Sequence, residues 1–345
     1  MTNVNTGPRI SHNSDNIDRR IAAYLDRLSL SPLATDVKRL HGDASSRSYA
    51  RVTQPDGSSF VLAVHDHPFD TDKLPQIRVG AIFTHLGIPV PEVIGQAGDL
   101  GILAVTDLGD VTLQDWMEVD SGRDPTSFYR EAIGLIVKLQ NGSAALSRER
   151  IVPFTLAFDT NKLNWELDFF RSEFLETYRE RTIIPAATEA LRHELSAIST
   201  ELAAEPRVLC HRDFHSRNLM VQRNRLVVID FQDARMGPST YDLVSLLRDC
   251  YVELPQSLVT NMIAYFLDEL PTNQGLDFQA RFDLMSVQRH LKALGTFGYQ
   301  ISRNSRPEFA AYLPRTLKYL RETLHAQRRF DRLLELLAQL IPELA

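Results

Sequence analysis

The sequence changes character near Gly109, and this change constrains the fold most strongly. Before Gly109, short extended runs are separated by turn signals such as Pro55-Asp56-Gly57, a pattern typical of strands in an antiparallel sheet. After Gly109, apolar residues recur mostly at helical spacing. The sequence therefore predicts an α+β fold with two lobes, a small strand-rich lobe followed by a larger and mainly helical one.

The length supports this division, because 345 residues and 39.1 kDa exceed what one hydrophobic core usually organises. We predict a disordered N-terminus over residues 1–15 and a nucleotide-binding N-lobe over 16–105. A hinge is expected at 106–109 and a helical C-lobe over 110–345. Apolar residues from Ile17 to Leu28 recur at helical spacing, and this helix is expected to cover the first lobe.

The expected secondary structure follows the same division. In the first lobe we expect strands at 37–40, 48–53, 60–64 and 102–106, with a helix at 72–86 that ends at Gly87. In the second lobe we expect helices at 125–140, 163–181, 186–204, 240–250, 255–269, 275–299 and 314–339. Short strands at 207–210, 219–221 and 226–229 interrupt them, the last two joined by a turn at Arg223-Asn224.

Composition and charge exclude several classes of protein. A net charge of -6 argues against a general nucleic-acid binder. Cys210 and Cys250 are too few for a disulfide framework, and the first fifteen residues lack the apolar core of a signal peptide. No apolar run approaches the ~20 residues that span a bilayer. We expect a cytoplasmic chain with a small-molecule substrate and no nucleic-acid, membrane or obligate protein partner.

Polar residues gather between two apolar runs in the second half of the chain. The segment His211 to Asn218 follows Val208-Leu209-Cys210, and a later apolar run, Leu226 to Ile229, ends abruptly at Asp230. Burying a carboxylate, an amide and two imidazoles together costs several kcal/mol unless each is paired or binds an ion. This pattern indicates a functional site.

The spacing of these residues suits phosphoryl transfer. That reaction needs a carboxylate to orient the attacking hydroxyl and metal ions to neutralise the phosphates. Asp213 lies five residues before Asn218, so one loop can present a base to the acceptor and an amide to a metal. Asn218 and Asp230 offer the hard oxygen ligands that Mg²⁺ prefers.

These motifs resemble a known group of enzymes. His-Arg-Asp, the Asn five residues after that Asp, and a strand ending in Asp-Phe resemble the catalytic and metal-binding segments of protein-kinase-like enzymes. Asp-Phe-Gln-Asp replaces Asp-Phe-Gly and no Ala-Pro-Glu segment follows, so the sequence is more similar to the aminoglycoside phosphotransferase and choline kinase superfamily. The resemblance implies a bilobal protein-kinase-like fold and the use of ATP and Mg²⁺.

Within that superfamily the chain most resembles the anomeric kinases for N-acetylmuramate and N-acetylglucosamine of bacterial cell-wall recycling. This implies a kinase that converts an amino sugar to its 1-phosphate. The similarity runs from about residue 40 to 300 and is carried by residues 42–49, 106–109, 211–220, 230–234, 237–238, 241–242 and 288–295.

The resemblance also implies roles for single residues. Asp213 would be the catalytic base, and Asn218 and Asp230 the magnesium ligands. His211 and Asp242 would support the catalytic loop. The nucleotide would contact the phosphate loop and the backbone of the hinge, at Asp43, Ala44, Ser45, Ser46, Arg47, Thr106 and Leu108. The residues considered for contact with the acceptor are Glu166, Asp168, His215, Arg217 and Asp233.

One departure concerns the phosphate grip. Protein kinases carry a Lys on the third strand that pairs with a Glu on the next helix, whereas Phe60 to His65 contains no Lys. Arg47 or, second, Lys73 would replace it.

Several alternatives remain open at this point. His211, Asp213 and His215 could form a transition-metal site. The acceptor could be an aminoglycoside, a choline-like compound or another small alcohol, and a pseudokinase that serves as a nucleotide-binding module is a third possibility. Aromatic residues at helical spacing, Trp165, Phe169, Phe170 and Phe174, could be core or a sugar platform. Residues 288–292 could place a cation near the acceptor or form a solvated helix face.

Overall fold

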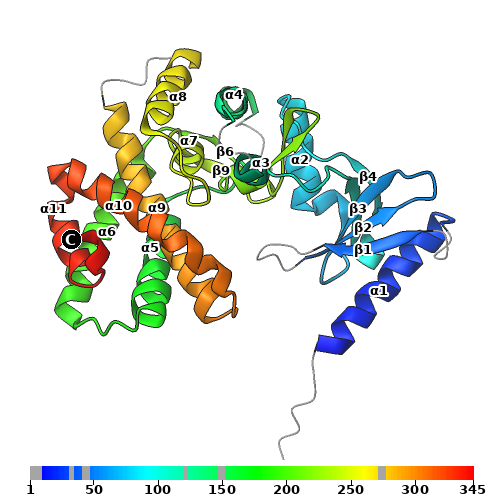
Figure 1. The fold of residues 1–345 in the computed structure, drawn as a ribbon, viewed down its shortest axis with the longest axis horizontal. Coiled ribbons are helices and arrows are strands. Elements are labelled where there is room, and N and C mark those ends of the chain that lie inside the picture. Colours follow the sequence, from blue (N-terminus) through cyan, green and yellow to red (C-terminus); the bar gives the residue numbers. More distant parts are fainter. Residues whose placement is uncertain (1–9, 31–34, 41–46, 120–122, 147–151, 271–276) are drawn as a thin grey trace, which may run out of the picture. The chain divides into compact units, whose positions relative to one another are not determined.

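The computed structural model describes residues 10–30, 35–40, 47–119, 123–146, 152–270 and 277–345 (Figure 1). The chain divides into two compact units. The first comprises Met1–Arg78 and Val90–Gly109, and the second Val79–Pro89 and Asp110–Ala345. One unit is built on a sheet and the other on helices, so the predicted α+β, two-lobed fold class is confirmed.

The first unit contains an antiparallel five-stranded sheet with the strand order β1-β2-β3-β5-β4. Its strands are β1 (Asp36–Leu40), β2 (Ser48–Thr53), β3 (Ser59–Val64), β4 (Val93–Ala97) and β5 (Ile102–Thr106). Gly57, at φ +83°, closes the predicted β2–β3 hairpin. β4 was not predicted, because a bulged edge strand lacks regular alternation. Its pairing with β5 shifts register between Val93 and Gly95.

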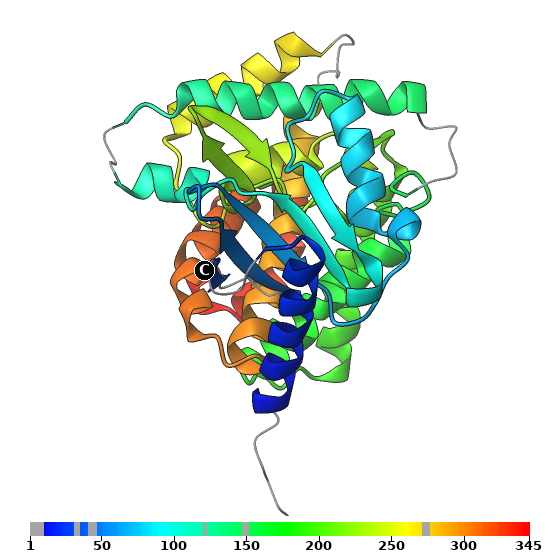
Figure 2. The ribbon, with the colours of Figure 1, turned by 90° about the vertical axis from the view of Figure 1, so that its right-hand side faces the viewer.

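Helix α1 (Ile10–Arg27) covers one face of this sheet, and Figure 2 shows it in dark blue alongside the blue strands. Ile21, Tyr24 and Leu25 are buried in one cluster with residues of β2, β3 and β5. Arg20 fixes the helix further, because its guanidinium donates to the carbonyls of Leu100 and His65 at 2.6 Å each. The helix begins at Ile10, so residues 10–15 are helical rather than part of a disordered N-terminus.

The opposite face of the sheet packs on the segment that leads into α2 (Pro75–His85). Ala63, Leu103 and Val105 form a second buried cluster with Leu74, against which Ile77 and other partly buried residues pack. From Val79 onwards α2 belongs to the second unit, where Phe83 packs on Phe231 with ring centroids 5.4 Å apart.

The second unit is mainly helical, with two small antiparallel pairs of strands. β6 (Arg207–Cys210) pairs with β9 (Arg235–Pro238), and β7 (Leu219–Gln222) with β8 (Arg225–Val228). Arg223 and Asn224 turn the second pair with φ of 48° and 61°. Its helices are α3 (Leu113–Val119), α4 (Thr126–Leu146), α5 (Thr160–Phe169), α6 (Pro185–Ala204), α7 (Tyr241–Leu247), α8 (Gln256–Glu269), α9 (Phe278–Ser302), α10 (Leu313–Ala326) and α11 (Asp331–Ala338).

Two of the expected long helices are interrupted. The segment 163–181 forms α5 followed by a π-helix over Phe170–Tyr178, and 314–339 forms α10 and α11. The second break occurs at Gln327, which is extended (φ -137°, ψ 122°) and donates its side-chain amide to Asp283. No Pro or Gly lies near this position, so we attribute the end of α10 to the tertiary contact between Gln327 and Asp283. Among the described residues, no helix is long and apolar enough to cross a membrane.

The π-helix and α9 approach closely at two glycines of α9. A Cβ at Gly295 would lie 2.8 Å from the Cα of Phe170, and one at Gly298 would lie 2.6 Å from the carbonyl oxygen of Glu173. Both obstacles are backbone atoms, which cannot rotate away. The two glycines therefore allow α9 to pack directly on the π-helix.

We predict that Gly295→Ala lowers the denaturant midpoint of unfolding, because overpacking against backbone costs about 1–3 kcal/mol and exceeds the gain of about 1 kcal/mol in helix propensity. Gly134→Ala in α4 is the matched control. Nothing lies within 4 Å of its added Cβ, so its midpoint should rise or stay unchanged. Urea unfolding followed by circular dichroism measures both, and equal midpoints for the two variants would contradict the packing argument.

Candidate active site

Asp242, on α7, anchors the loop between β6 and β7. It is buried, and its carboxylate accepts the backbone N–H groups of His211 at 2.6 Å and of Arg212 at 3.0 Å. Arg212 has φ +90°, which is unfavourable for a non-glycine residue. The paired bonds to one carboxylate hold this strained turn in place, in line with the supporting role predicted for Asp242.

His211 links the loop to the end of β8. Its Nε2 lies 2.9 Å from the carbonyl oxygen of Ile229, and its Nδ1 accepts the backbone N–H of Asp213 at 3.3 Å. Burial lowers the pKa of the ring, so the neutral tautomer with a proton on Nε2 fits both contacts. Both nitrogens are used. Within the described ranges, no group of three His, Cys, Asp or Glu side chains could hold a metal, so the transition-metal alternative is wrong.

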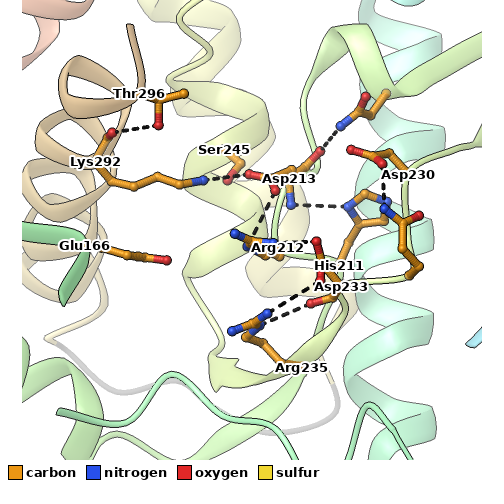
Figure 3. Close-up of polar contacts among 12 residues, drawn as sticks. Glu166, His211, Arg212, Asp213, Asp230, Asp233, Arg235, Ser245, Lys292 and Thr296 are labelled. Carbon is orange, nitrogen blue, oxygen red and sulfur yellow. Dashed lines mark hydrogen bonds and ion pairs between the residues drawn. The ribbon is translucent and has the colours of Figure 1, made fainter. Parts of the chain in front are cut away.

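Asp213 lies among three cations, of which Figure 3 labels Lys292 and Arg212. Lys292 Nζ is 2.8 Å from Asp213 Oδ1, Arg289 Nη1 is 3.6 Å from the same oxygen, and Arg212 Nε is 3.6 Å from Oδ2. Burial alone would raise the pKa of Asp213, but Lys292, Arg212 and Arg289 together hold it well below its usual range. The carboxylate is therefore ionised at neutral pH.

Lys292 and Arg289 come from α9, so the segment 288–292 places cations at Asp213 and is not a solvated face. Gln288, His290 and Leu291 are buried in the same stretch. The sequence analysis left this choice open, because the pairing of Lys292 with Asp213 spans 79 residues and no local pattern reports it.

Asn218 and Asp230 lie at the two ends of the β7–β8 hairpin. Asn218 donates its side-chain N–H to the carbonyl oxygen of Asp213 at 2.8 Å. This bond directs the amide nitrogen toward Asp213 and the amide oxygen, Oδ1, away from it. The N–H of Ile229 donates to the carbonyl oxygen of Asn218 at 3.0 Å, which brings Asp230 next to Asn218. Asp230 has φ +62° and accepts from Gln232 at 2.8 Å. The structure thus brings the three predicted residues together.

Of the residues considered for the acceptor, Glu166 and Asp233 belong to this cluster. Glu166 is 2% exposed, accepts Gln288 Nε2 at 2.9 Å and points toward Arg212 in Figure 3. Asp233 accepts Arg212 Nη1 at 2.7 Å. Asp168 does not join them, because its side chain is 63% exposed and pairs with Arg171.

His215 and Arg217 pack into an aromatic cluster instead. The His215 ring lies 4.9 Å from Tyr251, and the Arg217 guanidinium lies 4.8 Å from the Tyr251 centroid and 3.4 Å from the hydroxyl of Tyr312. Burial lowers the pKa of His215 to about 3. These contacts support the loop, but His215 Nδ1 is among the buried atoms of the described residues that have no hydrogen-bond partner. A contact of either residue with the acceptor therefore stays a prediction.

The aromatic stripe divides into core and surface. Phe170 and Phe174 are fully buried, whereas Trp165 is 57% exposed and stacks on Phe169 with centroids 5.5 Å apart. The buried pair is therefore core, and Trp165 remains available to a ligand.

In the first unit, Asp43 to Ser46 of the predicted phosphate loop lie outside the described residues. Arg47, which directly precedes β2, donates to Gln76 on α2 at 3.0 Å. This contact links a cation beside the sheet to the helix that follows β3. Lys73 pairs with Asp70 and is 80% exposed. Arg47 is thus the better candidate for the missing phosphate-gripping cation.

Thr106 and Leu108 flank Asp107, which the sequence analysis did not single out. Its carboxylate accepts Arg51 at 2.6 Å, Ser59 at 2.7 Å and the N–H of Gly109 at 3.0 Å. The N–H of Thr106 donates to the carbonyl oxygen of Glu92 at 2.9 Å. These bonds tie the predicted hinge segment to β2 and β3.

Comparison with solved structures defines the class of fold. A choline/ethanolamine kinase family protein from Mesorhizobium loti superposes with a TM-score of 0.60 at 15% identity, covering 94% of this chain and 99% of that one. A gentamicin complex of APH(2")-IIa gives a TM-score of 0.57 at 15% identity, with 92% and 97% covered. The fold is therefore that of the small-molecule kinases.

The sequence comparisons are more specific. The chain belongs to the phosphotransferase enzyme family (APH), whose model matches residues 36–278. An N-acetylmuramate/N-acetylglucosamine kinase of Neisseria meningitidis serogroup B is 34% identical over 306 residues, covering 87% of this chain and 88% of the relative. A kinase of the same name from Pseudomonas putida is 29% identical, with 86% of each covered. The predicted superfamily and enzyme class are confirmed.

The depressed pKa of His215 predicts a loss of stability in acid. The unfolded chain binds a proton near the ordinary pKa of 6.5, but the folded ring does so near pH 3. Stability contributed by the neutral ring is therefore present above pH 6.5 and lost as the pH falls toward 3. Between pH 7 and pH 5 the free energy of unfolding of the wild type should fall, and His215→Asn should make this fall smaller by about 1–2 kcal/mol. Urea midpoints at both pH values measure this.

His193→Asn is the control for the substitution itself, because the side chain of His193 is 80% exposed. It should leave the pH dependence as in the wild type. If His215→Asn retained the full acid sensitivity, the assignment to His215 would be wrong.

Proposed function

We propose that this phosphotransferase moves the γ-phosphoryl group of ATP to the anomeric hydroxyl of N-acetylmuramate or N-acetylglucosamine, giving the sugar 1-phosphate. The observation that carries the proposal is the ionised Asp213, held in a loop next to Asn218 and Asp230. The acceptor is taken from relatives that match this chain over nearly its whole length. An enzyme that uses ATP would act in the cytoplasm, where the nucleotide is made.

Asp213 would accept a hydrogen bond from the anomeric hydroxyl, orient it for in-line attack and take its proton. A carboxylate with a lowered pKa is a weak base, but phosphoryl transfer passes through a loose transition state in which positioning matters most. The rigid anchoring of the loop by Asp242 and His211 serves this purpose.

Asn218 and Asp230 would hold Mg²⁺. The donor set fits the ion, because one amide oxygen and one carboxylate leave room for phosphate and water ligands. The bond from Asn218 to the Asp213 carbonyl orients the amide for this task. When bound, the ion supplies charge neutralisation for the nucleotide phosphates. The phosphate loop from Asp43 to Arg47 and the backbone of Thr106 and Leu108 would hold ATP.

The charges around Asp213 favour a neutral or acidic acceptor over a cationic one. Lys292, Arg289 and Arg212 all lie within 3.6 Å of its carboxylate. A cationic alcohol such as an aminoglycoside or a choline-like compound would be repelled by these groups. An N-acetylated sugar carries no such charge.

The direct test is to incubate the protein with ATP, Mg²⁺ and each amino sugar and to locate the new phosphate by ³¹P NMR. We expect a sugar 1-phosphate and ADP. If the protein consumes ATP with amines but with neither N-acetyl sugar, the proposed acceptor is wrong. If it shows no magnesium-dependent ATP consumption with any acceptor, a nucleotide-binding module without catalysis is favoured.

Asp213→Asn should lower kcat by about 10²–10⁴-fold, the usual contribution of a positioned base, and leave ATP affinity within about twofold. A coupled ADP assay and nucleotide titration measure the two quantities. Asp331→Asn, at an exposed position on α11, is the matched control and should behave as wild type. Unchanged turnover in Asp213→Asn would remove the base assignment.

Lys292→Met should shift the acid limb of the kcat/KM profile to higher pH. Lys292 lowers the pKa of Asp213, so its removal raises that pKa, and more of the carboxylate is protonated at mildly acidic pH. Lys292→Arg should restore most of the wild-type profile. A lower rate with an unshifted limb would show that Lys292 acts on structure alone.

A further inference from the structure

Three cations from separate elements of the second unit gather around the Arg212 side chain. They are Lys162 on α5, Arg212 in the catalytic loop and Arg235 on β9, and their side chains are 23%, 21% and 11% exposed. Arg212 and Arg235 share Asp233, at 2.7 Å and 3.9 Å respectively. Lys162 lies 3.4 Å from Glu166. Such a cluster is costly to bury unless anions balance it.

The anions present do not balance it. With the two cations of α9, five cations face four carboxylates once Asp230, the proposed Mg²⁺ ligand, is set aside: Lys162, Arg212, Arg235, Arg289 and Lys292 against Glu166, Asp213, Asp233 and Asp242. Burial first, and then repulsion by Arg212 and Arg235, lowers the pKa of Lys162. With Asp230 assigned to Mg²⁺, the remaining side chains are thus one negative charge short.

Hydrogen-bonding capacity is also left over at this place. In the part of the chain that the structure describes, Gln288 Oε1 is buried and has no hydrogen-bond partner. Arg212 Nε and Glu166 Oε1 also lack hydrogen bonds and make only long ion pairs, at 3.6 Å to Asp213 and 3.4 Å to Lys162. Glu166 is 2% and Gln288 0% exposed. Buried polar atoms without well-placed partners are unfavourable, so the arrangement is suited to a ligand that brings donors for the two oxygens and an acceptor for the guanidinium.

An apolar wall lies next to these groups. Lys162 Nζ sits 4.0 Å from the centroid of the Trp165 ring, which is 57% exposed. Trp165 stacks on Phe169, and Phe169 lies 5.5 Å from the ring of Tyr299. Exposed aromatic faces of this kind bind the C–H faces of sugar rings.

We infer that Lys162, Arg235 and Arg212 form a carboxylate-binding subsite, in which an acidic substituent on the acceptor sugar replaces the missing negative charge. Trp165 packs on the sugar ring or its substituent, and Glu166 and Gln288 accept hydrogen bonds from its hydroxyl or amide groups. The inference rests on the proposed function. Of its two acceptors, N-acetylmuramate carries such a carboxylate on its lactyl ether and N-acetylglucosamine does not, so the subsite makes the acid the preferred substrate.

The test compares kcat/KM for the two sugars in Lys162→Met and Arg235→Met. Both variants keep an apolar stem where the native side chains lie over the rings of Trp165 and Phe158. The ratio of kcat/KM for N-acetylmuramate to that for N-acetylglucosamine should fall about tenfold to a hundredfold in each variant, as expected for a charge-assisted bond. Lys162→Arg keeps the charge and should restore the wild-type ratio.

Two controls separate charge from folding. The methyl ester of N-acetylmuramate removes the charge from the ligand, so wild type and Lys162→Met should use it with similar kcat/KM. Arg192→Gln, at an exposed pair with Glu189 on α6, should leave the ratio at its wild-type value.

An unchanged ratio, or equal losses with both sugars and the ester, would overturn the subsite. If wild type phosphorylates neither sugar, the proposed function fails instead, and the two failures are therefore distinguishable.

Discussion

The bonds from Asp242 to the loop that follows β6 are the constraint on which the site depends. One buried carboxylate accepts two successive backbone N–H groups, and so stabilises a positive φ at Arg212 that would otherwise cost about 1–3 kcal/mol. This turn directs the Arg212 side chain to Asp233 and the next residue, Asp213, toward α9. Without the brace, neither side chain would have a fixed direction.

The position of α9 is the second requirement, because this helix supplies Lys292 and Arg289. It is set on its other side by the π-helix, which packs against Gly295 and Gly298. Gly295 and Lys292 are three residues apart and occupy neighbouring positions along the helix. The glycine contact therefore helps to fix the turn of α9 that carries Lys292, whose Nζ lies 2.8 Å from Asp213.

Much of the site could be predicted from the sequence because its residues are local. Asp213, Asn218 and Asp230 lie within one loop and one hairpin, and strand ends flanked by apolar runs mark their positions. The residues that the sequence left undecided act over long distances. Lys292 meets Asp213 across 79 residues, and Asp107 pairs with Arg51 across 56. The same reason explains why β4, β9 and the end of α10 at Gln327 were not predicted. The two short strands are defined by pairing with β5 and β6, and Gln327 by its contact with Asp283.

The charges around Asp213 reconcile two demands that would otherwise conflict. A strong base would need a raised pKa, yet the cations lower it. In a loose transition state the attacking hydroxyl loses its proton late, so orientation matters more than basicity. The negative charge spread over the transferring group is then the larger problem. If Asp213 is the base proposed above, Lys292, Arg289 and Arg212 would face the acceptor. The same positive field that lowers the pKa of Asp213 would then suit the phosphoryl group and an acidic acceptor, and disfavour a cationic one.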